Sequence, residues 1–144
     1  MKFLGYRWTD DSVIPTKLQK EIDDILEIDL GELRSSLVDI AHNESQILQI
    51  IYTLGIAVIM AENKVSKKRK EKFEYYTFKV NRTLSSTQVK ISMDTDQDII
   101  DLETDLRLLN AKLKFFESIQ SQLKQKSSNI RTLMYWEGYI EGNR

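Results

Sequence analysis

The sequence contains no cysteine, one proline, five glycines and one histidine among its 144 residues. Without cysteine, the chain cannot form a disulfide, a thiolate zinc site, an iron–sulfur site or a thiol nucleophile. The scarcity of proline and glycine argues against a loop-rich or many-stranded fold and favours long, uninterrupted elements. A length of 144 residues fits one domain, since domains have about 100–200 residues.

Catalytic motifs are also absent from the sequence. There is no glycine-rich phosphate loop, no Gly-x-Ser-x-Gly motif and no pair of histidines. The single histidine, His42, is expected to be a solvated or packed helical residue rather than a base. Asp94 to Asp98 resembles the opening of an EF-hand loop, but Ile99 and Ile100 stand where that loop needs glycine and a backbone ligand. We therefore predict an acidic helix start there, no metal, no cofactor and no enzymatic activity.

Charged residues make up 30% of the chain and apolar residues 41%, which is too apolar for a disordered chain and too charged for a membrane protein. The most apolar run, residues 46–61, would span about 24 Å as a helix, less than a hydrocarbon core of about 30 Å. The N-terminus lacks an apolar run long enough for a signal peptide. We predict that residues 46–61 form a helix buried on most sides, and that the protein has no membrane partner.

Two long helices with heptad spacing are predicted. Each is marked by eight positions spaced alternately by three and four residues, seven of them apolar. The first row is Leu33, Leu37, Ile40, Glu44, Ile47, Ile51, Leu54 and Val58; the second is Ile99, Leu102, Leu106, Leu109, Leu113, Phe116, Gln120 and Leu123. The first helix has another apolar face through Leu48, Tyr52, Ile56 and Ile59, and two apolar faces imply two partners. The fold is therefore predicted to be all-α and self-associating, with Ile99, Leu102, Leu106, Leu109, Leu113 and Phe116 as the oligomerisation seam.

The rest of the chain gives weaker signals. Residues 1–15 are predicted to be an irregular arm, followed by a short amphipathic helix through Leu18, Ile22 and Ile25. Residues 77–95 favour a loop, with a short strand left open. The aromatic C-terminus, with Tyr135, Trp136 and Tyr139, is interpreted as packing rather than as a partner contact. We divide the chain into an arm with a short helix, 1–27, and a single helical domain, 28–144.

One segment, residues 64–72, concentrates positive charge in a chain whose net charge is −1. Its basic residues are Lys64, Lys67, Lys68, Arg69, Lys70 and Lys72, against one acid. Such a basic stripe is a candidate phosphate site, and the rings of Tyr75 and Tyr76 beside it can stack on unpaired bases. Three alternatives stay open: a solvated charged face, aromatic residues that belong to the core or to an interface, and a basic helix lying on an anionic membrane.

The segments Lys70–Tyr76, Asp96–Leu106 and Lys126–Gly142 together resemble the UvsY family of recombination mediators of T-even-type phages. The likeness lies in a basic run before an acidic residue and two tyrosines, an Asp-x-Asp helix opening, and the C-terminal stretch, in the same order and spacing. It spans about residues 28–142. Residues 1–27 have no matching counterpart, and residues 77–95 differ.

The resemblance implies a small non-enzymatic protein that forms a ring-shaped homo-oligomer, a hexamer or a heptamer. Such a protein binds single-stranded DNA and loads a RecA-like phage recombinase onto strands coated by single-stranded-DNA-binding protein. It would act in DNA recombination, repair and replication in the cytoplasm of the infected bacterial host.

The family's DNA contacts include a lysine and an arginine at the positions of Lys70 and Lys72, and both are expected to face solvent. Lysine in place of arginine keeps the charge but loses the planar fork. The competing hypothesis is an oligomeric helical scaffold or assembly chaperone that does not bind nucleic acid.

Overall fold

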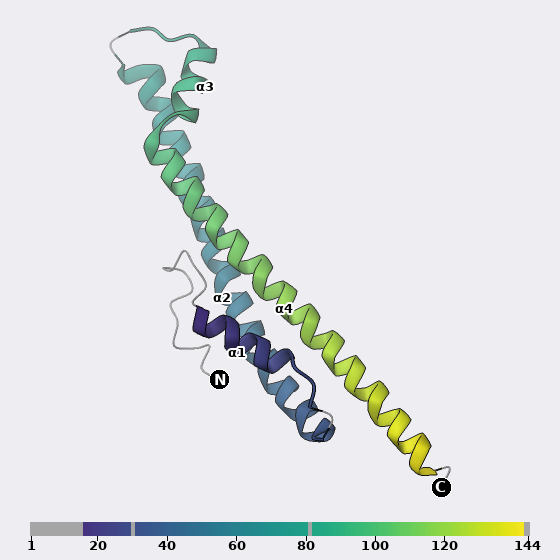
Figure 1. Ribbon diagram of the computed structural model, residues 1–144. Helices are drawn as coiled ribbons and strands as arrows, with labels where there is room; N and C mark the ends of the chain where they lie inside the picture. Colours follow the sequence, from purple (N-terminus) through teal and green to yellow (C-terminus); the bar gives the residue numbers. More distant parts are fainter. Residues whose placement is uncertain (1–15, 30, 81, 143–144) are drawn as a thin grey trace. The chain divides into compact units, whose positions relative to one another are not determined.

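The computed structural model describes residues 16–29, 31–80 and 82–142, with side chains from residue 19 onward. The elements are α1 (Thr16–Leu26), α2 (Leu33–Glu74), the π-helix η2 (Tyr75–Lys79), α3 (Ser86–Asp94) and α4 (Gln97–Gly142) (Figure 1). The described part of the chain contains no strand, so the predicted all-α class is confirmed. The predicted arm at 1–15 and the side chain of Leu18 lie outside the described residues.

The chain forms two compact units, and both long helices contribute to each. One unit is made from residues 1–53 and 112–144, and the other from residues 54–111. Helix α1, which was predicted as the short amphipathic helix, belongs to the first unit. The predicted boundary between residues 27 and 28 stays a prediction.

The first unit contains an apolar cluster formed by residues of α2, of α4 and of the segment that follows α1. Leu33, Ile40 and Ile130 form a buried cluster against which half-buried apolar residues pack. Lys126 of α4 donates from Nζ to the carbonyl of Ile25 in the last turn of α1, at 2.6 Å. This bond satisfies a carbonyl that the end of a helix leaves unpaired. Burial lowers the pKa of Lys126, against the opposing effect of nearby carboxylates.

The second unit contains the greatest departure from the sequence-based expectation. The loop with a possible strand predicted over 77–95 is wrong, because η2 and α3 fill most of it. Ser85 caps α3: its hydroxyl accepts the backbone N–H of Gln88 at 3.3 Å, and the Gln88 side chain accepts the backbone N–H of Ser85 at 2.9 Å. Ser85 and Gln88, polar residues of a segment that suggested a loop, thus form a capping box. Val89 is buried and packs the helix against the rest of its unit.

The predicted acidic start of the second long helix is confirmed. Asp96 directly precedes α4, and its Oδ1 accepts the backbone N–H of Asp98 at 3.0 Å. An aspartate at this position satisfies one of the N–H groups that the first turn leaves unpaired. Ile99, the first apolar residue of the predicted row, is buried.

Both predicted rows are helical, but residues 46–61 are not buried on most sides. Leu48, Tyr52 and Ile59 are 57%, 71% and 58% exposed, because only the opposite face of α2 packs within the chain. The argument that this run is too short to span a bilayer is also wrong, because the run lies inside a helix of 42 residues.

Among the described residues, an 18-residue window in the helix Leu33–Lys79 reaches a mean hydropathy of 1.5, which is enough to cross a membrane by length and composition alone. The core helix of a soluble protein meets the same criterion. In this chain 22% of the window is buried, and the rest is half-buried or exposed.

The packing in the first unit gives a stability prediction. Ile40 is 3% exposed within the apolar cluster, so Ile40→Ala should lower the free energy of unfolding by about 2–5 kcal/mol. Val38→Ala on the same helix is the control, because Val38 is 70% exposed and its loss should change stability by about 0.5 kcal/mol or less. Urea unfolding followed by circular dichroism measures both. Equal midpoints for the two variants would show that the cluster around Ile40 is not a core.

Candidate nucleic-acid interface

The six predicted basic residues lie on the last third of α2 and separate into two groups. Lys64, Lys67 and Lys70 are exposed and form no ion pair within the described part of the chain. The other three are partly buried and paired. Lys68 forms a salt bridge of 2.9 Å with Glu71, and the pairs of Arg69 and Lys72 join α2 to the segment that begins α4.

Lys72 is held between two aspartates. Its Nζ lies 2.7 Å from Oδ2 of Asp98 and 3.1 Å from Oδ2 of Asp96, and its side chain is 20% exposed. The expectation that Lys72 faces solvent is therefore wrong. The hydrogen bond to Asp98, then that to Asp96, raises the pKa of Lys72, so the ammonium is held firmly in its charged form.

The carboxylate of Asp96 is the centre of this cluster. The Tyr76 hydroxyl donates to its Oδ2 at 2.7 Å, and its side chain is 7% exposed. Burial alone would raise the pKa of Asp96, but the hydrogen bonds from Tyr76 and Lys72 outweigh burial and lower it. The same bond to Asp96 raises the pKa of Tyr76. A carboxylate that caps α4 and binds two groups from α2 and η2 fixes the geometry of this unit.

Arg69 forms the second link between α2 and α4. Its Nε lies 3.0 Å from Oε1 of Glu103, and a terminal nitrogen lies 3.8 Å from Oδ1 of Asp94. The side chain of Arg69 is still 40% exposed. Arg69 therefore combines a structural pair with partial access to solvent.

Spacing along α2 explains why Lys68 and Lys72 lie on the packed face of the helix. The inward row continues from Leu54 and Val58 through Ala61, Val65, Lys68 and Lys72, again in steps of three and four residues. Lys68 and Lys72 thus occupy positions that apolar residues fill earlier in the helix. This signal was present in the sequence, and it would have placed Lys72 on the packed face.

The two tyrosines also differ in their surroundings. The ring of Tyr76 is partly buried and its hydroxyl is bonded to Asp96, whereas Tyr75 is 47% exposed. Their rings meet edge to face at 5.2 Å. The ring of Tyr75 is therefore accessible to a ligand, while Tyr76 contacts it edge to face and is itself bonded to Asp96.

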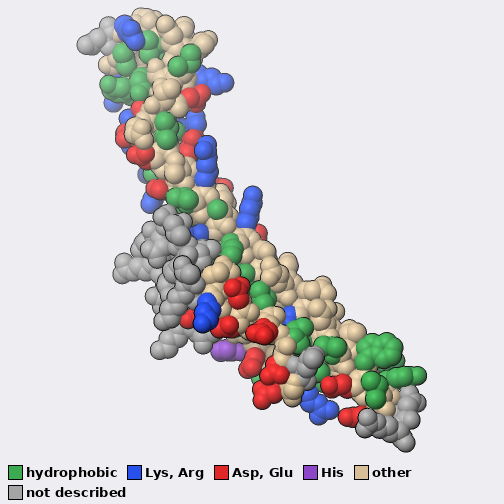
Figure 2. Space-filling view, in the orientation of Figure 1, with side chains coloured by type: hydrophobic (Ala, Val, Ile, Leu, Met, Phe, Trp, Pro, Cys, Tyr) green, Lys and Arg blue, Asp and Glu red, His purple; other side chains and the backbone are tan. Residues whose placement is uncertain are grey.

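Sequence reasoning missed further exposed residues close to this segment. Phe73 and Phe78 are 50% and 78% exposed, and Lys79, Arg82 and Lys90 are also exposed. Figure 2 shows Lys and Arg side chains among hydrophobic ones on the unit that contains α3. The sequence contained a signal for these residues, because Phe73 directly follows Lys72 and Phe78 directly precedes Lys79.

The predicted oligomerisation seam lies mostly inside the chain. Ile99 and Phe116 are 1% and 0% exposed, so neither has surface left for a second copy. The remaining members are half-buried: Leu102, Leu106, Leu109 and Leu113. Their role in assembly stays a prediction, and the more exposed apolar surface is the outer face of α2.

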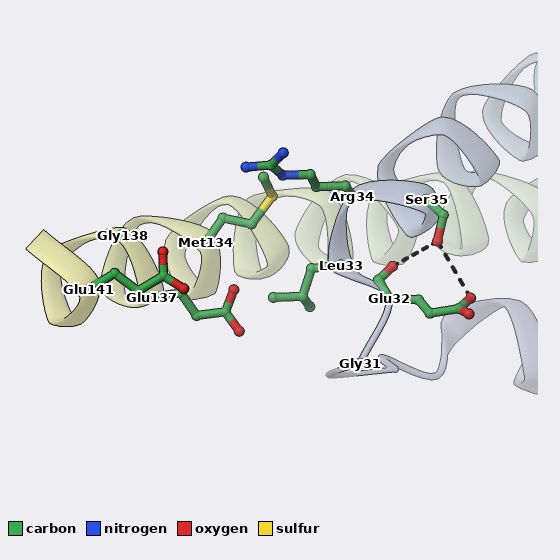
Figure 3. A pocket seen from close by; sticks show the side chains of 9 residues that line it. All are labelled: Gly31, Glu32, Leu33, Arg34, Ser35, Met134, Glu137, Gly138 and Glu141. Atoms are coloured by element: carbon green, nitrogen blue, oxygen red, sulfur yellow. Dashed lines mark hydrogen bonds between the residues drawn. The ribbon is translucent and has the colours of Figure 1, made fainter.

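The C-terminal end of α4 carries a second exposed aromatic group. Tyr135, Trp136 and Tyr139 are 70%, 54% and 56% exposed, and Trp136 meets the two tyrosines edge to face at 6.1 Å and 5.8 Å. A nearby pocket in the same unit is lined by Leu33 and by residues of α4 that include carboxylates (Figure 3). The aromatic side chains pack on one another within the chain, and most of their surface remains open.

Long helices that present a row of exposed lysines beside an exposed aromatic ring are typical of helical proteins that bind nucleic acids. The family of the recombination, repair and ssDNA binding protein UvsY matches residues 7–143, so the chain belongs to the UvsY family. The predicted resemblance is confirmed, and the match extends further toward the N-terminus than the motifs indicated.

Solved structures of the bacteriophage T4 recombination mediator protein UvsY share this fold. One, from its lattice type II, has a TM-score of 0.78 at 16% identity and covers 90% of this chain and 98% of that chain. Another, from lattice type IV, has a TM-score of 0.76 at 17% identity and covers 86% and 96%. No curated protein sequence matches the chain.

The Asp96 cluster predicts a pH dependence of stability. Because the folded-state pKa of Asp96 is lowered, its charge stabilises the fold above the unfolded pKa of about 3.9, and this contribution is lost as pH falls through the lower folded value. Asp96→Asn keeps the cap but removes the charge, so it should cost on the order of 1–3 kcal/mol at pH 7. The difference from the parent should shrink as pH falls below about 4.

Urea unfolding between pH 3 and 7 measures this difference. Asp105→Asn is the matched control on α4, because Asp105 is exposed and should not change the profile. A constant gap between parent and Asp96→Asn at every pH would mean that the charge of Asp96 does not stabilise the fold.

Proposed function

We propose that this protein is a non-enzymatic recombination mediator that binds single-stranded DNA. It helps to load a RecA-like phage recombinase onto strands coated by single-stranded-DNA-binding protein, in the cytoplasm of an infected bacterium. Membership of the UvsY family supports this role, and the surface of α2 supports the DNA contact. The partners and the loading step follow from the family resemblance.

The observation that carries the DNA contact is the outward lysine row of α2. Lys64, Lys67 and Lys70 are spaced by three residues and rise about 4.5 Å per step along the helix. All three are exposed and have no carboxylate partner in the described residues, so their charge is available to phosphates. Exposed Tyr75 lies just beyond them and can stack on a base.

Of the two positions that correspond to the family's DNA contacts, Lys70 is the better candidate. Lys70 is exposed and unpaired within the described chain, whereas Lys72 neutralises two aspartates. A phosphate that reached Lys72 would have to displace carboxylates that already hold it. We therefore assign Lys70 to DNA and treat Lys72 as a residue that holds α2 to the start of α4.

Assembly of several copies is the second part of the proposal. Each copy offers few free cations, so tight binding needs several copies on one strand, as in a ring of six or seven. The outer face of α2 has exposed Leu48, Tyr52, Ile56 and Ile59, at 57%, 71%, 42% and 58%. Apolar exposure of this extent on one helix suits contact with a second copy.

The assignment of Lys70 predicts a separation between binding and stability. Lys67→Ala with Lys70→Ala should weaken binding to an oligo-dT strand and flatten its salt dependence by about 0.7 in log–log slope per lost phosphate contact. Thermal stability should stay unchanged, since both side chains are exposed. Lys72→Ala should have the opposite pattern. It should lower the thermal midpoint, because it leaves Asp96 without its cation, and it should leave the affinity for the strand unchanged. Fluorescence anisotropy across a salt series and thermal unfolding measure the two effects.

The same assay decides between DNA binding and the competing hypothesis of a helical scaffold or assembly chaperone. Failure of the parent protein to bind single-stranded oligonucleotides at low salt would refute the DNA role. Equal affinity of the parent and the double lysine variant, with the same slope, would reject the assignment to Lys67 and Lys70.

Assembly through α2 gives a separate prediction. Tyr52→Glu with Ile56→Glu should reduce the native mass of the protein, because two carboxylates on the apolar face oppose its burial. Helicity should be retained, since neither side chain is in the core. Ile91→Glu is the control: Ile91 is 58% exposed on α3, outside this face, and its replacement should leave the mass unchanged. Native mass spectrometry with and without an oligonucleotide reads the outcome. An unaltered mass for the double variant would contradict assembly through this face.

A further inference from the structure

Two phenylalanines near the basic segment are exposed although the chain has apolar cores that could hold them. Phe73 in the last turn of α2 is 50% exposed, and Phe78 in η2 is 78% exposed. Phe78 is the most exposed large apolar side chain among the described residues. A single exposed apolar side chain needs no explanation, so it is the surroundings of these two rings that indicate a contact.

The surroundings of these two rings are basic. Between residues 64 and 92 the sequence has nine basic and two acidic residues. Lys70 precedes Phe73 by three residues, which makes the two neighbours on the helix surface, and Lys79 follows Phe78 directly. Arg82 and Lys90 are also exposed and form no ion pair within the described part of the chain, and α3, which carries Lys90, packs against η2.

The turn that presents Phe78 is anchored. Tyr76 lies in the same π-helix, and its hydroxyl donates to Asp96, which caps α4. Lys72, one turn earlier, binds the same carboxylate. A ring carried by a fixed turn loses less conformational entropy on binding than one on a free loop, and short π-helical segments recur at functional sites.

We propose that Phe73 and Phe78, together with Lys79, Arg82 and Lys90, form a base-stacking extension of the single-stranded-DNA interface. The rings receive unpaired bases, and the cations hold the adjacent phosphates. This proposal rests on the proposed function and adds a second half to its site. It predicts that the protein recognises bases as flat faces, without reading their hydrogen-bonding edges.

Charge favours a nucleic acid over a protein as the occupant. Protein–protein interfaces are depleted of lysine at their cores, whereas rings among cations are typical of surfaces for single strands. A second copy that met this surface with the same surface would bring like charges together, which opposes association. A strand of nucleic acid supplies both the negative charge and the flat apolar faces.

The test compares a dT strand with an abasic strand of the same length, which keeps the phosphates and lacks the bases. For the parent protein, the abasic strand should bind more weakly. Phe78→Ala should weaken binding to the dT strand about 5- to 150-fold, which corresponds to ~1–3 kcal/mol per stacked base, and should leave binding to the abasic strand unchanged. The salt slope should be the same for both proteins, since no phosphate contact is lost. Phe73→Ala should act in the same way, and Phe78→Tyr should retain the preference for dT.

Two controls make the result decisive. Ile91→Ala removes exposed apolar surface from the same unit without removing a ring, and it should not change binding to either strand. Native mass should be equal for the parent and Phe78→Ala. A loss of affinity for both strands together, or a fall in mass, would assign Phe78 to assembly and overturn the proposal.

A second negative result separates this inference from the proposed function. A parent that binds both strands equally well, with no selective effect of Phe78→Ala, would overturn stacking and leave DNA binding intact. A parent that binds neither strand at low salt would overturn both.

Discussion

The inward row of α2 is the constraint on which the rest of the structure depends. Its members recur every three or four residues from Leu33 to Lys72, and each faces the interior because the period of the helix demands it. In its first part the row is apolar except at Glu44, and its buried members belong to the cores of the two units. In its last part the row becomes Lys68, which pairs with Glu71 of α2, and Lys72, which pairs with two carboxylates at the start of α4. Those carboxylates belong to Asp96 and Asp98, and Asp96 also caps the helix that carries the second row.

The long helices could be predicted from the sequence because their information is periodic. A row such as Ile99 to Leu123 repeats one signal many times, so no single residue decides it. The segment after Tyr76 is different: α3 has nine residues, and its start depends on one reciprocal pair, Ser85 with Gln88. Serine favours turns and helix caps for the same reason, because its hydroxyl bonds nearby backbone, so composition alone could not separate the two.

The candidate site shows the same division between local and tertiary information. The concentration of basic residues at 64–72 is visible in the sequence itself, and the exposed lysines agree with the prediction of a basic surface there. Which cations stay free could not be predicted by counting, because Lys72 and Arg69 are neutralised by residues more than twenty positions away. The period of the inward row would have placed Lys72 on the packed face of α2, and so among the cations that are not free. The exposure of Phe78 depends on a π-helical turn, which has no composition signal comparable to that of an α-helix.

Ion pairing inside the chain therefore changes the physical picture of how this protein would hold a strand. A segment with a formal charge of +5 offers three free lysines per copy on α2, so phosphate attraction from one copy is weak at physiological salt. Two features offset this weakness. Stacking on exposed rings does not depend strongly on salt, and several copies on one strand bind in concert through their effective concentration. The partly buried pairs contribute indirectly, because Lys72 and Tyr76 both bind Asp96 and hold the aromatic turn in place beside the free lysines. Weak, non-specific contacts distributed over several copies would suit the proposed mediator, which would hold single strands of any sequence and then release them to a partner.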